Sequence, residues 1–276
     1  MSSAGSSGPG RDDPGAEGEA EPYGNAGLGA AQFSTIGLAL SLVAGACAPV
    51  DLKDLRVPES VPSDSCVVLG FLGGRDARDD ESKGVRQLAL RLRNTEPHLY
   101  TETFANRQRH LAEAFLLRAL DRNREGRIDP SESRTLVIYG QSFGGAATVK
   151  FAWRLARLLV PVYLTIQIDS VGSGDDRIPP NVAYAANLYQ DDGWIIQGEN
   201  PIRAIDRSQT QILGNWRFDY GTAPGSEISL GGVSWWKRFM RVAHAKMDGD
   251  PRVWSLVERL IRSACRRDRA ALLEAG

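Results

Sequence analysis

The sequence predicts an α/β fold built on a mostly parallel sheet, with helices on both faces and therefore three layers. Segments typical of strands and of helices alternate along its central part, which is the pattern of such a sheet. Three segments have the length of strands: residues 61–69, which end in the apolar run SCVVLG, and the apolar runs at residues 135–140 and 161–169. Runs of this kind are typical of strands covered on both faces.

The other predicted elements are less marked. In residues 84–93, the apolar residues Val85, Leu88, Ala89 and Leu92 recur at helical spacing. Further helices are predicted at about 107–120, 146–159 and 253–261, and shorter strands at 99–104 and 210–216. Between residues 170 and 234, Gly, Pro, Asn and Asp are frequent, and 210–216 is the only strand predicted there.

Composition limits the classes of function. The chain has 276 residues, of which 42% are hydrophobic and 24% charged, as expected for one α/β domain with some extra sequence. A formal net charge of -1 gives no reason to expect nucleic acid as a partner. The three cysteines are too few for a disulfide framework, and no Cys/His spacing indicates zinc.

The N-terminal part differs from the remainder. Residues 1–32 are rich in Gly, Ala, Ser and acidic side chains and are predicted to be disordered. Residues 33–50 are uncharged and resemble the apolar part of a signal peptide, and Cys47 after Ala44-Gly45-Ala46 resembles a lipoprotein acceptor. Ala44 stands where Leu is usual, and the preceding segment is acidic. We expect export to the cell envelope, with lipidation and a cytoplasmic location left open. Residues 51–276 then form the catalytic domain.

One motif carries specific chemistry. Gly140-Gln141-Ser142-Phe143-Gly144 lies between an apolar strand and a helix that begins with small residues. This is the context of a nucleophile elbow, in which the serine occupies a strained turn and its hydroxyl is accessible. The backbone N–H of Phe143 would lie at the N-terminus of the helix and face a developing oxyanion. A Gly-rich turn without catalysis is the alternative.

With this motif the chain resembles the α/β-hydrolase family, over roughly residues 61–262. In that family an oxyanion loop follows an earlier strand, and Phe71-Leu72-Gly73-Gly74 stands at that place here. The resemblance implies that the N–H of Phe71 or Leu72 is the second oxyanion donor. Leu69 stands where the family often has His, so that part of its pattern is absent.

A serine nucleophile needs a base and a carboxylate that orients it. The family order is serine, acid, histidine, and His244 is the only histidine after Ser142. Asp169 ends the strand after the elbow helix and is the preferred acid. Many family members carry the acid one strand later, so Asp206 and Asp219 remain alternatives.

A second motif resembles a calcium-binding EF-hand loop and spans residues 121–132. Gly126 stands at the sharp turn. The predicted ligands are Asp121, Asn123, Glu125, Arg127 (through its carbonyl), Asp129 and Glu132. No second loop pairs with it, so we expect weak, structural calcium binding that catalysis does not need. A polar turn is the alternative.

Taken together, the sequence predicts a serine hydrolase that acts on a carboxylic ester, which includes lipid esters, with thioesters and amides equally compatible. The expected partner is this small-molecule or lipid substrate, with membrane contact only through the N-terminal anchor. The alternative from another class is a catalytically silent hydrolase fold that serves as a calcium-binding envelope protein.

Overall fold

The computed structural model describes residues 61–190, 201–222 and 244–275, together with residues 52, 55, 57, 58, 227 and 228. They belong to one unit, which spans Pro49–Gly276. The predicted disordered segment 1–32, the leader-like segment 33–50 and Cys47 lie outside the described residues.

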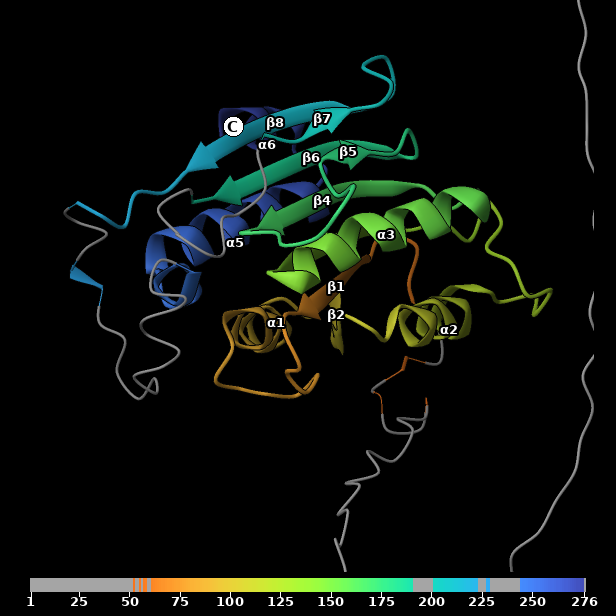
Figure 1. The fold of residues 1–276 in the computed structure, drawn as a ribbon. Helices are drawn as coiled ribbons and strands as arrows, with labels where there is room; N and C mark the ends of the chain where they lie inside the picture. Colours follow the sequence, from red (N-terminus) through yellow and green to blue (C-terminus); the bar gives the residue numbers. More distant parts are fainter. Residues whose placement is uncertain are drawn as a thin grey trace, which may run out of the picture. The chain divides into compact units, whose positions relative to one another are not determined.

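A six-stranded parallel sheet with the order β2-β1-β3-β4-β6-β8 forms the centre of this unit (Figure 1). Its strands are β1 (Cys66–Leu72), β2 (Leu99–Ala105), β3 (Thr135–Gln141), β4 (Val162–Ile168), β6 (Val182–Tyr189) and β8 (Gln211–Arg217). The predicted α/β class and parallel sheet are therefore confirmed. β1 and β3 lie inside the sheet and are buried along their whole length, as their continuous apolar runs predict.

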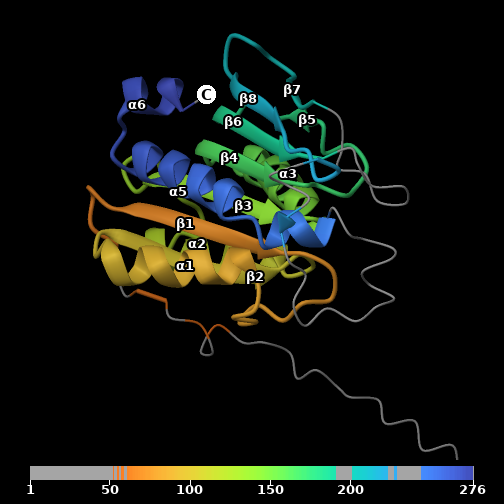
Figure 2. The same ribbon diagram turned by 90° about the vertical axis from the view of Figure 1, so that its left-hand side faces the viewer.

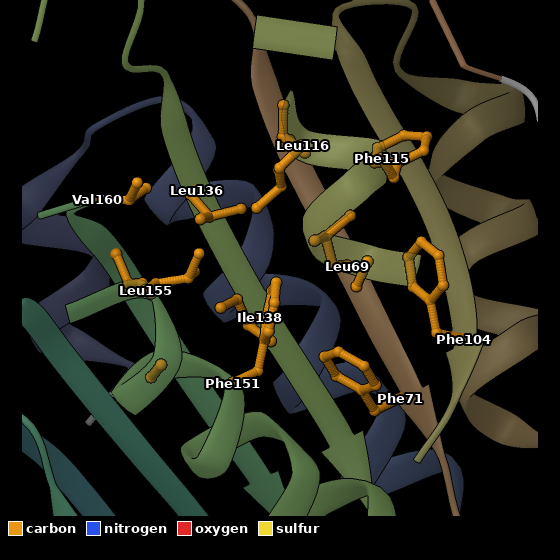
Figure 3. Close-up of a cluster of buried hydrophobic side chains, with 14 of the residues drawn as sticks. Leu69, Phe71, Phe104, Phe115, Leu116, Leu136, Ile138, Phe151, Leu155 and Val160 are labelled. Atoms are coloured by element: carbon orange, nitrogen blue, oxygen red, sulfur yellow. The ribbon is translucent and has the colours of Figure 1, made fainter. Parts of the chain in front are cut away.

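Helices cover both faces of the sheet and complete the three predicted layers (Figure 2). The helices α2 (Arg109–Leu120) and α3 (Phe143–Arg157) pack on one face, and α1 (Gly84–Thr95) and α5 (Pro251–Cys265) pack on the other. Successive side chains of a strand point to opposite faces. Leu69 and Phe71 of β1 accordingly join the core under α2 and α3, shown in Figure 3, whereas Val68 joins the other.

Several predicted boundaries were wrong. β1 begins at Cys66, because residues 62–65 form a turn closed by the Ser65 N–H on the Pro62 carbonyl. It continues through Phe71 and Leu72, which were expected in the following loop. The elements that the sequence did not predict are β6, the two-stranded sheet of β5 (Arg177–Ile178) and β7 (Arg203–Ala204), and α6 (Arg269–Glu274).

A disulfide joins Cys66 at the start of β1 to Cys265 at the end of α5. The two residues are 199 positions apart in sequence, and their Cα atoms are 5.4 Å apart. The link ties the first strand of the unit to the helix that covers it. Within the part of the chain that the structure describes, no helix has the length and apolar character needed to cross a membrane.

Candidate active site

Ser142 occupies the sharp turn between β3 and α3, where the sequence predicts a nucleophile elbow. Its backbone has φ 59° and ψ -129°, an uncommon conformation for a residue with a side chain. The turn requires glycine at position 144, because a Cβ there would lie 1.9 Å from the carbonyl oxygen of Phe71. The strand, the strained serine and the helix thus form the elbow geometry.

Asp169 lies beside this turn because β4 is the neighbour of β3. Gln141 and Ile168 are partners in the parallel register, so the residue after each strand, Ser142 and Asp169, emerges at the same edge. The Ser142 N–H donates to the Ile168 carbonyl at 2.9 Å, and the Val171 N–H donates to the Ser142 carbonyl at 3.2 Å. Asp169 also has a positive φ, of 45°. Polar residues at this edge are where open α/β sheets place their chemistry.

His244 contacts Asp169 directly. The Nδ1 atom of His244 is 2.5 Å from Oδ2 of Asp169, and both side chains are buried. An ionised carboxylate at this distance favours the tautomer with its proton on Nδ1 and leaves Nε2 as the basic nitrogen. The other two histidines are exposed: His98 lies in the turn before β2, and His110 lies on α2.

Gln190 is a part of this arrangement that the sequence did not predict. It follows β6, the strand after which many hydrolases carry their acid, and its Nε2 donates to both carboxylate oxygens of Asp169 at 3.3 Å. The alternatives Asp206 and Asp219 are exposed instead. Hydrogen bonds within their own turns, from Ser208 and Thr222 respectively, lower their pKa values.

Ser142 and His244 line one cavity of about 530 Å³. One wall is the turn after β1, from Gly73 to Asp76, and another is the short helical stretch 244–248. Lys83 lies 3.6 Å from Asp76, and Asp248 accepts the Gly84 N–H at 3.3 Å. Burial raises the pKa of Asp248, which Lys83 partly counteracts. Charged side chains thus surround the serine on these walls.

The candidate oxyanion donors are only partly where the sequence predicts them. Phe143 is the first residue of α3, where a helix N–H has no partner within the helix. Phe71 is in contrast a buried residue of β1, paired with Phe104 and Gly140. Gly73 lies against the serine, since a Cβ on it would be 2.8 Å from Cβ of Ser142 and 3.3 Å from Oγ. The loop beside the serine therefore begins at Gly73, two residues after Phe71, where the sequence predicts its start.

The stretch that carries His244 is joined to the sheet through Asp250. This buried carboxylate caps α5 and accepts hydrogen bonds from the Arg252 guanidinium and, at 2.8 Å, from the Tyr220 hydroxyl. Tyr220 follows β8, so this contact connects the last sheet strand to the turn just after His244. The sequence Asp-Gly-Asp-Pro signals the helix start, but not these partners.

The predicted calcium loop follows α2, and its oxygens are engaged by the protein itself. Asp121 accepts the N–H groups of Glu125 and Gly126, and Glu132 accepts those of Arg122, Asn123 and Asp129. The Arg127 side chain pairs with Glu125 and Asp129. Among the described residues, no group of three or more His, Cys, Asp and Glu side chains is arranged to hold a metal ion.

Comparisons with known proteins assign no role to these residues, so their roles are argued from the geometry alone. No protein-family model and no curated protein matches the chain. A cutinase-like protein from Cryptococcus sp. aligns at 13% identity and a TM-score of 0.40, over 73% of this chain and 95% of that one. Aspergillus fumigatus lipase B aligns at 12% identity and a TM-score of 0.42, over 76% and 60%. The three layers on a parallel sheet and the strand–serine–helix elbow are consistent with an α/β-hydrolase-like fold.

Proposed function

We propose that this chain is a serine hydrolase that cleaves a carboxylic ester through an acyl-enzyme intermediate. The observation that carries the proposal is the buried pair of His244 and Asp169, whose imidazole borders the same cavity as Ser142. Burying a carboxylate costs desolvation free energy, which the contact with the imidazole at 2.5 Å offsets in part. Orienting a catalytic base is a role that would account for such a buried pair.

In the proposed reaction, Oγ of Ser142 attacks the ester carbonyl carbon while its proton passes to Nε2 of His244. The carbonyl oxygen becomes an oxyanion, held by the N–H of Phe143 and an N–H of the Gly73–Gly74 turn. The tetrahedral intermediate collapses, and the leaving alcohol takes the proton from His244. Water then attacks the acyl-serine with His244 again as base, which releases the acid and restores the serine.

Asp169 keeps its charge throughout and stabilises the imidazolium that forms in each step. Its charge is supported by the Nε2 of Gln190. The mechanism uses only side chains and backbone groups, so calcium in the 121–132 loop would serve structure alone. The same constellation would act on thioesters and amides, and we propose the ester, lipid esters included, as the first class to test.

The Cys66–Cys265 disulfide supports the proposal that the protein works after export. Structural disulfides persist in oxidising compartments and are rare in the cytosol. The predicted leader and the acceptor-like Cys47 would supply the route and the anchor.

The proposal is tested by hydrolysis of p-nitrophenyl butyrate by wild type and by Ser142→Ala, His244→Ala and Asp169→Asn. We expect each variant to lose about 10⁴-fold in kcat. His110→Ala, which changes an exposed histidine on α2, is the matched control and should keep the wild-type rate. If folded wild type shows no hydrolysis of esters, thioesters or amides above the Ser142→Ala background, the silent-fold alternative is the better one.

A further inference from the structure

The loop between β4 and β5 contains a buried pair of polar side chains that the proposed mechanism does not use. Ser170, directly after Asp169, hydrogen-bonds through Oγ to Oδ2 of Asp175. Both side chains are buried, and Asp175 has no exposed surface. Gln167 at the end of β4 donates its Nε2 to the Asp175 backbone carbonyl at 2.9 Å. Asp175 is thus hydrogen-bonded to the first part of the loop and to the end of β4.

Asp175 has few partners for a buried carboxylate. Its Oδ1 has no hydrogen-bond partner in the described part of the chain, so Ser170 is the only side chain there that donates to it. Burying a carboxyl with so little compensation is costly. This cost suggests that the Asp175 side chain has a role in the loop.

The pair also packs against the first turn of the nucleophile helix. A Cβ on Gly145 would lie 2.8 Å from both Cβ and Oγ of Ser170, so the loop and α3 are in tight contact. Next to Ser170, the Val171 N–H donates to the Ser142 carbonyl. A shift of Ser170 would therefore move Asp169, its neighbour in the chain, and the elbow, which it contacts at Gly145.

Asp169 needs such support, because its φ of 45° is unfavourable for a residue other than glycine. Conformations of this kind cost about 1–3 kcal/mol and persist only where the surroundings impose them. We propose that Asp175 is a positioning residue: through Ser170 it fixes the backbone that holds Asp169 against His244 and beside Ser142. This inference rests on the proposed serine-hydrolase function.

The test compares Asp175→Ala, Asp175→Asn and Ser170→Ala in the full chain, with p-nitrophenyl butyrate as substrate. Displacement of a catalytic group by about 1 Å can cost about 10²-fold in rate. We expect Asp175→Ala and Ser170→Ala to lower kcat at least about tenfold with KM within about twofold. Asn keeps an oxygen that accepts the Ser170 hydroxyl, so Asp175→Asn should recover most of the loss.

Thr165→Val is the control for simple destabilisation. Thr165 is also buried on β4, and its hydroxyl has no hydrogen-bond partner among the described residues, the loop between β4 and β5 included. It should leave kcat unchanged whatever its melting temperature. If Asp175→Ala does not fold, Ser170→Ala and Asp175→Asn decide the question.

The two proposals fail in different ways. Active wild type with unchanged kcat in Ser170→Ala and Asp175→Ala would overturn the positioning role and leave the hydrolase intact. A loss of kcat that Asp175→Asn does not recover would also overturn the role as stated. Inactive folded wild type would overturn both.

Discussion

At the scale of single residues, Ser142 and Asp169 both have a positive φ, but they differ in how far the sequence predicts them. The elbow around Ser142 is predictable, because glycine at position 144 and the small residues that follow are visible in the sequence. Asp169 is only one of several aspartates near strand ends. Its place at the end of the strand after the elbow helix made it the preferred acid, but its contact with His244, 75 positions away, is not encoded by a local pattern.

Gln190 was missed for a related reason. It reaches Asp169 because β6 lies next to β4, and β6 itself was not predicted. Residues 182–189 mix Ala, Asn and Tyr in place of a continuous apolar run. Asn187 faces Asn215 of β8 and hydrogen-bonds to it at 3.1 Å, so polar side chains are satisfied inside this half of the sheet.

We predict that Gln190→Leu lowers kcat by about tenfold, because it removes a hydrogen bond to a charged group worth about 1.5 kcal/mol. Ester hydrolysis by the purified variant measures this. Asn187→Ala, a change to another buried amide on the same segment, is the control and should affect stability more than kcat. Equal kcat values for Gln190→Leu and wild type would show that Gln190 does not support the acid.

At the scale of elements, α5 and the stretch that carries His244 are held in place by Asp250. Burial alone would raise the pKa of the Asp250 carboxyl, but hydrogen bonds from Arg252 and Tyr220 outweigh it and lower that pKa. A carboxyl with a lowered pKa in the folded state contributes stability above its unfolded pKa. This contribution is lost as the pH falls through the folded value.

Asp250→Asn should therefore cost about 2 kcal/mol of unfolding free energy at pH 7. The gap to wild type should persist down to about pH 5 and close below about pH 4. Urea unfolding across this range measures it. Asp268→Asn, at the cap of α6, is the control, because the Asp268 side chain accepts the Ala271 N–H and Asn caps a helix as well as Asp does. A gap that does not change with pH would contradict this assignment.

Calcium binding by the 121–132 loop stays a prediction. The loop has the donors, but binding requires Arg127 to release Asp129 and Glu125, which agrees with the weak affinity expected from a single loop. At ten times its Kd, calcium would add about 1.4 kcal/mol of stability and raise Tm by about 3 °C. Glu132→Gln should abolish the rise. Identical melting curves with 10 mM calcium and with EDTA would argue for a polar turn.

At the scale of the whole molecule, the alternation of strands and helices was enough to predict a parallel sheet in three layers. Strands β5, β6 and β7 were not predictable in the same way, because β5 and β7 have two residues each and β6 contains the polar Asn187. The pairing of the cysteines was not predictable either, since their spacing in the sequence does not show which of them lie close in space. The fold places Cys66 and Cys265 together by packing α5 on β1.

Reduction of this disulfide should lower the unfolding free energy by about 5 kcal/mol, because it closes a loop of 199 residues. Urea unfolding with and without dithiothreitol measures the effect. Cys66→Ser should show the lower stability in both conditions, whereas Cys47→Ser should behave like wild type. A midpoint that reduction does not move would contradict the link and weaken the case for an oxidising compartment.

The central claim is that Ser142 is an activated nucleophile, and labelling with a fluorophosphonate followed by peptide mapping tests it most directly. The account predicts an adduct on Ser142 in wild type, none in Ser142→Ala, and strongly slowed labelling in His244→Ala that still melts cooperatively. Folded wild type that remains unlabelled, or a His244→Ala variant that labels at the wild-type rate, would contradict it.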